Sequence, residues 1–153
     1  MEPEVYFLKY AFPCSFVLWK IGRQITEEEY RRLEDVAVNN KVLPREFLER
    51  VFTTAFGQIE KIAEELGKDK WDVNVIKEYF CVRHNAFLEH FDNPAGLKEI
   101  CKVYKAVVKE VGDDELIVEY GEGKKRKVKK TFVRDVKVGD KVTIHYDYAV
   151  EKI

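Results

Sequence analysis

Apolar residues follow two patterns along this chain, and the pattern changes near residues 92–96. Before that segment, apolar positions recur every three or four residues, which is typical of amphipathic helices. After it they alternate with polar positions, as in strands that are buried on one face. The sequence therefore predicts an α+β protein, with a helical domain over residues 1–95 and a small β-barrel domain over residues 98–153.

Four to five helices are expected in the first domain. Residues 5–21 are strongly apolar and aromatic, and Pro13 predicts a break or kink in that helix. Thr26 and Glu29 have the spacing of a capping box, in which each side chain accepts a hydrogen bond from the other residue's backbone. A second helix is therefore expected from this box to about Val38.

Two further helices complete the predicted helical domain. Pro44 fits the first turn of a helix, where its missing N–H removes no hydrogen bond, and Gly67 fits the end of the same helix. The apolar spacing then predicts a last helix over about residues 72–91.

The second domain shows short alternating segments that are separated by Gly/Asp turns. The predicted strands are residues 103–111, 116–120, 128–133 and 142–148. These segments are too short for a large sheet, so we expect the strands to close into a small five-stranded barrel or near-barrel. Cys101 opens the first of these strands and His145 lies in the last.

Composition narrows the range of functions. The 153 residues carry a net charge of −1, 46% are hydrophobic and 36% are charged, mainly as Lys and Glu. Such a charged composition favours a thermophilic source, and the near-zero net charge gives no overall attraction to nucleic acid. With no bilayer-spanning run and no signal-peptide pattern, a cytoplasmic protein without a membrane segment is expected. No phosphate loop or catalytic triad motif appears, so we predict a non-enzyme.

Three segments of the second domain carry a family resemblance. They are residues 101–111, residues 123–133 and the closing sequence DVKVGDKVTIHYDYAVEKI at 135–153. Together they resemble the HypC/HupF hydrogenase-assembly chaperones, which have a Cys-led opening strand, a middle hairpin and a closing segment with a Val-Gly-Asp turn and a His. In this chain Lys105 and Ala106 stand where the family has Pro-Gly, and Asp147 stands where it has Gly.

The resemblance implies an OB-like barrel that binds partner proteins during metallocentre assembly. It places the family's essential cysteine on Cys101 and its assisting histidine on His145, as ligands of a transient iron that is passed to the nickel–iron hydrogenase. The implied partner is a hydrogenase maturation factor or precursor. A thiolate and an imidazole suit such a metal, although two ligands are too few for a stable structural zinc site.

A second pair of donors lies in the helical domain. Cys81 and His84 have the spacing that brings two side chains to one face of a helix, which makes them a candidate second metal site. The simpler interpretation is a packed histidine beside the apolar stripe. A third hypothesis is a redox or metal sensor that uses all three thiols, Cys14, Cys81 and Cys101.

A basic run and an aromatic helix suggest contacts with other molecules. The run consists of Lys124, Lys125, Arg126, Lys127, Lys129 and Lys130. With Tyr120 and Phe132 beside it, this hairpin is a candidate surface for nucleic acid or an acidic protein. In the first helix Tyr6, Phe7, Tyr10, Phe16 and Trp19 are expected in the core, and any exposed part would favour a homodimer.

The leading hypothesis is a non-catalytic accessory or interaction protein, of which HypC/HupF-type metallocentre assembly is the most specific form. The alternative hypothesis is an OB-like nucleic-acid-binding protein that uses the basic hairpin at residues 124–130.

Overall fold

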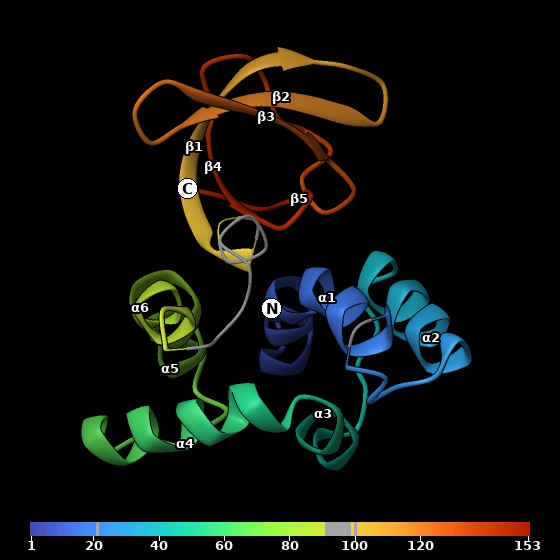
Figure 1. Ribbon diagram of the computed structural model, residues 1–153, viewed down its shortest axis with the longest axis vertical. Coiled ribbons are helices and arrows are strands. Elements are labelled where there is room, and N and C mark those ends of the chain that lie inside the picture. The colour runs from blue at the N-terminus through green and yellow to red at the C-terminus, as the bar shows by residue number, and fades with distance from the viewer. Residues whose placement is uncertain (21, 91–98, 100) are drawn as a thin grey trace. The chain divides into compact units, whose positions relative to one another are not determined.

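The computed structural model describes residues 1–20, 22–90, 99 and 101–153. The α+β architecture is confirmed, because helices occupy the N-terminal part and five strands form a closed OB-like barrel in the C-terminal part (Figure 1). The chain divides into two compact units, which are Met1–His84 and Asn85–Ile153. The predicted boundary at residues 92–96 lies outside the described residues.

The helical unit consists of consecutive helices joined by short turns. Its elements are α1 (Pro3–Lys20), α2 (Glu27–Val38), α3 (Arg45–Val51), α4 (Thr53–Leu66), α5 (Val73–Glu78), the π-helix η1 (Tyr79–Arg83) and the beginning of α6 (His84–Leu88). The predicted capping box is present: Glu29 N–H donates to Thr26 Oγ1, and Thr26 N–H donates to Glu29 Oε1, each at 3.1 Å. Gly67 ends α4 in the left-handed conformation, also as predicted.

Aromatic side chains of α1 form the core of this unit. Phe7 is fully buried, and its ring packs against the rings of Phe52, Phe56, Trp71 and Phe80 at centroid distances of 4.7–5.8 Å. A helix that buries residues on all sides is expected to be apolar all round, which explains the composition of α1. A homodimer through α1 stays a prediction.

Three helix predictions need correction. The predicted break at Pro13 is wrong, since α1 continues through it, and burial of the helix outweighs the roughly 3 kcal/mol penalty of an internal proline. The alternative, a kink at Pro13, stays a prediction. The helix expected from Pro44 to Gly67 is two helices, since Phe52 leaves the helical conformation at φ −105°, ψ 51°. The last predicted helix contains η1, and Phe91 at its expected end lies outside the described residues.

The barrel consists of β1 (Val103–Val111), β2 (Glu115–Tyr120), β3 (Lys124–Lys129), β4 (Lys141–His145) and β5 (Tyr148–Lys152). Its strand order is β1-β2-β3-β5-β4, and β4 pairs with β1 to close it. The β3–β5 pair is parallel, with Lys129 opposite Tyr148, while the other pairs are antiparallel. Alternate residues fill the interior, among them Val108, Val118, Val142, Ile144 and Ala149.

The strand predictions were correct for β1 and nearly correct for β2, but wrong for the others. The third strand covers the basic run at Lys124–Lys129 and does not reach residue 133. The last predicted strand is two strands, because Tyr146 adopts a positive φ of 56° and turns the chain between β4 and β5. Cys101 is helical and precedes β1, so it does not open that strand.

Within the described residues, the search for a helix of membrane-spanning length and hydropathy found none.

Candidate functional site

The two donors implied by the resemblance lie at one end of the β1–β4 ladder. His145 is the last residue of β4, and its Cα partner is Val103, the first residue of β1. Cys101 is helical and comes shortly before Val103 in the chain. Both side chains are buried, since Cys101 is 8% exposed and His145 is 0% exposed. The register therefore brings a thiol and an imidazole to the same edge of the barrel.

The chain next to Cys101 is held by side chains from the preceding segment of its own unit. Asn85 Nδ2 donates to the Val103 carbonyl at 2.7 Å, and Val103 N–H donates to Asn85 Oδ1 at 2.8 Å. Lys102 forms an ion pair with Glu89, and this partner raises the pKa of Lys102. These contacts fix the start of β1 and thereby restrict where Cys101 can lie.

The other predicted pair, Cys81 and His84, falls on an irregular helix. Cys81 lies in η1, and its sulfur donates a hydrogen bond to Tyr10 Oη at 3.5 Å. His84 is the first residue of α6 and is 4% exposed. The prediction assumed α-helical spacing between them, whereas η1 has the wider turn of a π-helix. Cys81 and His84 therefore do not have the α-helical spacing on which the prediction of one shared helix face depended.

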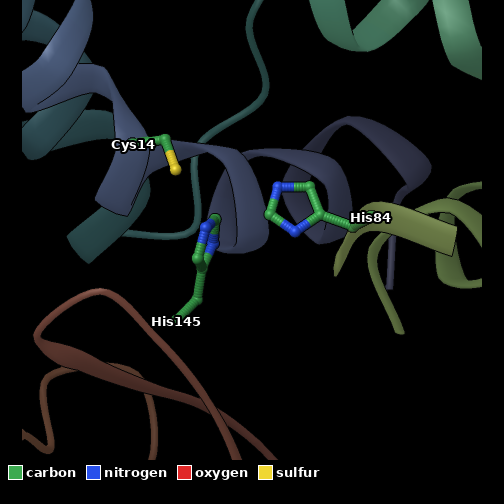
Figure 2. A group of neighbouring side chains, drawn as sticks. All are labelled: Cys14, His84 and His145. Carbon is green, nitrogen blue, oxygen red and sulfur yellow. The ribbon is translucent and has the colours of Figure 1, made fainter. Parts of the chain in front are cut away.

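A different thiol lies close to His84 within the helical unit. Cys14 is on α1, directly after Pro13, and its sulfur lies within 4.8 Å of a ring nitrogen of His84 (Figure 2). Cys14 is half-buried. His145, which Figure 2 also draws, belongs to β4 of the barrel unit.

Aromatic rings surround this second pair. The ring of Tyr79 meets the His84 imidazole edge-on at 5.5 Å between centroids, and Phe80 lies at 5.9 Å. Burial raises the pKa of Tyr79, and the nearby Cys14 raises it further because a thiolate there repels a phenolate. Cys14, Tyr79 and His84 therefore form one cluster.

Sequence reasoning missed the pairing of Cys14 with His84. Cys14 entered only as one of three thiols in the sensor hypothesis, and His84 entered as the partner of Cys81. No spacing motif links residues so far apart in the sequence. The pairing depends on how α1 packs beside the α5–η1 segment, which only the tertiary structure shows.

The basic run of the predicted binding hairpin is strand β3, and acidic groups accompany it. Lys124 pairs with Glu99 at 2.7 Å, and Lys129 pairs with Asp147 at 3.5 Å. Lys125 lies opposite Glu119 in the β2–β3 register. Neighbouring carboxylates therefore offset much of the positive charge that the sequence places on this strand.

Arg126 faces a pair of tyrosine rings. Its guanidinium lies 4.6 Å from the Tyr120 ring centroid and 5.9 Å from that of Tyr104, and the two rings lie 4.8 Å apart. Arg126 also donates to the Tyr120 hydroxyl and to the Tyr146 carbonyl. This arginine is thus engaged within the barrel, whereas Lys124, Lys125, Lys127 and Lys129 of the predicted surface are exposed on β3. Lys130 follows the strand and is half-buried.

No protein-family model matches this sequence, and no curated protein matches it.

Proposed function

We propose that this chain is a non-catalytic interaction protein whose barrel serves metallocentre assembly in the manner of the HypC/HupF chaperones. The observation that supports this proposal is the closed OB-like barrel with Cys101 and His145 at the same end of the β1–β4 ladder. The partner is a metalloenzyme precursor or another maturation factor, and iron is the cargo.

The donor chemistry is suited to this role, whereas the burial of the donors limits it. A thiolate and an imidazole are both good ligands for iron. Two protein ligands leave coordination positions for the cargo's other ligands, as transient binding requires. Because Cys101 and His145 are both buried, transfer of a metal requires this edge of the barrel to open. The contacts of Lys102 and Val103 with Glu89 and Asn85 hold the chain next to Cys101.

Thiol labelling and iron titration of the full chain test the proposal. Native protein is treated with an alkylating reagent, the modified cysteines are identified by mass spectrometry, and anaerobic Fe²⁺ binding is measured in parallel. We expect Cys101 to react in the native state, more slowly than a model thiol, and iron uptake to fall in Cys101→Ala and His145→Gln. The sulfur-matched variant Cys81→Ala is expected to retain iron uptake.

One outcome of these measurements would contradict the proposal. If Cys101 reacts only after unfolding and iron uptake does not depend on Cys101 or His145, the likeness to the chaperone family is limited to the fold.

The alternative proposal, a nucleic-acid-binding protein, has one favourable observation. Tyr104, Tyr120 and Arg126 gather aromatic and cationic groups on strands β1–β3, and OB-fold proteins bind single strands with such groups. The carboxylates beside Lys124, Lys125 and Lys129 oppose it, because phosphate binding draws its affinity from uncompensated positive charge. The interaction-protein proposal is therefore preferred.

A further inference from the structure

The helical unit holds a sulfur and a nitrogen donor within reach of one metal ion. The Cys14 sulfur and a His84 ring nitrogen lie within 4.8 Å of each other (Figure 2). In a tetrahedral zinc site, bonds of about 2.3 Å to sulfur and 2.0–2.1 Å to nitrogen place the two donors roughly 3.5 Å apart. A small side-chain adjustment is enough to reach that separation, since both donors sit on side chains with rotatable bonds.

Both donors also stand next to an irregular point in a helix. Pro13, which precedes Cys14, lies inside α1, where it has no N–H to complete the hydrogen-bond ladder. His84 directly follows the π-helix η1. An internal proline destabilises a helix, and short π-helices occur frequently at functional sites.

The environment of Cys14 and His84 also suits them as ligands of a soft metal ion. His84 is buried, and the rings of Tyr79 and Phe80 hold its imidazole in place. A fixed ring orientation favours ligation, because the ligand is then already ordered before the metal binds. Cys14 is half-buried, so an ion can approach the sulfur from solvent.

We propose that Cys14 and His84 form a binding site for a thiophilic d¹⁰ metal ion, Zn²⁺ or Cu⁺, in the helical unit. Thiolate sulfur selects these ions over hard cations, and imidazole is a good ligand for both. The two side chains supply part of the ligand set, and solvent or further donors supply the rest. This site goes beyond the proposed function, since it uses neither Cys101 nor the iron cargo.

Metal titration of the full-length protein tests the site. Zn²⁺ is titrated in competition with a chromophoric chelator, and Cu⁺ is titrated anaerobically in the same way, so the two experiments decide which ion binds more tightly. We expect Cys14→Ser and His84→Gln each to weaken binding by more than the roughly 10- to 100-fold that loss of an outer-shell partner costs. The matched thiol variant Cys81→Ser is expected to bind as the wild type does.

A spectroscopic measurement on the wild type keeps the test independent of how well the variants fold. Co²⁺ replaces Zn²⁺, and a thiolate-to-cobalt charge-transfer band in the near ultraviolet reports a metal–sulfur bond. We expect this band in the wild type and in Cys101→Ala, and its loss in Cys14→Ser.

Three results would overturn the proposal. One is the absence of a charge-transfer band in the wild type. Another is binding that is lost in Cys81→Ser but kept in Cys14→Ser, which would restore the pair predicted from sequence. The third is binding that survives both Cys14→Ser and His84→Gln. Because Cys101→Ala separates the barrel donors from Cys14, failure here is distinguishable from failure of the proposed function.

Discussion

The two units present their candidate donors in different ways. In the barrel, the ladder register pairs Val103 with His145, and Cys101 comes shortly before Val103 in the chain as a helical residue. In the helical unit, Cys14 and His84 approach each other through packing of α1 beside the segment that includes η1. The comparison shows that the barrel donors lie beside positions that a strand register defines, whereas the helical donors meet only through tertiary packing.

The same contrast holds for the cores. Ring–ring packing around Phe7 fills the helical unit, while aliphatic residues fill the barrel. Replacing Phe7 by Ala should lower the free energy of unfolding by about 3–5 kcal/mol. Replacing Leu116 of the barrel by Ala should cost about 2–5 kcal/mol, and less than Phe7→Ala, because aromatic pairs add about 0.5–1.5 kcal/mol each.

Chemical denaturation of both variants measures these differences. A smaller loss of stability in Phe7→Ala than in Leu116→Ala would contradict the view that the aromatic cluster organises the helical unit.

Two glycines, one in each unit, allow the backbones of the units to be compared. Gly67 ends α4 at φ +64° and Gly139 turns the chain before β4 at φ +94°, and a Cβ at either position meets nothing within 4 Å. Steric room is therefore equal, and only the backbone angle differs. Gly67→Ala should cost about 1–2 kcal/mol, since it adopts the left-handed helical region. Gly139→Ala should cost more within the range of about 1–3 kcal/mol, because its φ lies further from that region.

Thermal unfolding of the two alanine variants checks the order. Equal losses, or a larger loss for Gly67→Ala, would show that the backbone angle does not decide the cost at these turns.

Acid sensitivity provides a third comparison. Burial by itself raises the pKa of Glu4, but the hydrogen bond from Arg45 Nε at 2.5 Å and the Arg45 charge outweigh burial, so its pKa lies below the ordinary value of 4.5. A lowered pKa in the folded state stabilises the protein above pH 4.5, and this stability is lost as the pH falls through the lowered pKa. In Arg45→Met the ion pair is lost, while burial and a backbone hydrogen bond of Glu4 remain. The helical unit should then be less stable above the lowered pKa, so its acid unfolding should begin at a higher pH.

The matched change in the barrel is Lys152→Met. The pKa of Asp140 is lowered first by the Lys137 N–H and only then by Lys152, so removal of Lys152 should shift acid unfolding less than Arg45→Met does. Circular dichroism during acid titration measures both shifts. A larger shift for Lys152→Met would contradict this order of causes.

The smallest expected effect concerns the basic strand. We expect single-stranded DNA or RNA to show little affinity at physiological salt, because carboxylates accompany Lys124, Lys125 and Lys129. Replacing Lys125, Arg126 and Lys127 by Glu should then change little in a fluorescence anisotropy titration. Tight binding that falls steeply with salt and disappears in the triple variant would instead support the nucleic-acid alternative.

Local chemistry explains which parts of the fold the sequence predicted. Thr26 with Glu29 and Gly67 gave correct helix ends, because capping depends on residues that are near in sequence. Pro13 lies inside a continuous α1, and Phe52 separates α3 from α4, so neither residue has the effect on helix ends that the sequence predicts. Tyr146 carries a positive φ without being glycine, so the turn between β4 and β5 had no sequence signal.

The candidate sites follow the same rule. Cys101 and His145 were singled out by resemblance, and the register pairs His145 with Val103, which follows Cys101 closely in the chain. Cys81 and His84 were predicted from α-helical spacing, which the π-helix η1 alters. Cys14 had no signal that paired it with His84, because tertiary contacts alone bring α1 to that residue.

Cysteine-resolved alkylation with and without Zn²⁺ tests the central contrast between the two units most directly. Native wild-type protein is labelled over time, and the extent of modification at Cys14, Cys81 and Cys101 is read separately by mass spectrometry. The account predicts that Zn²⁺ markedly slows modification of Cys14 and leaves the rate at Cys81 unchanged, because a metal-bound thiolate is protected from alkylation. Identical modification rates for Cys14 with and without the metal would contradict it.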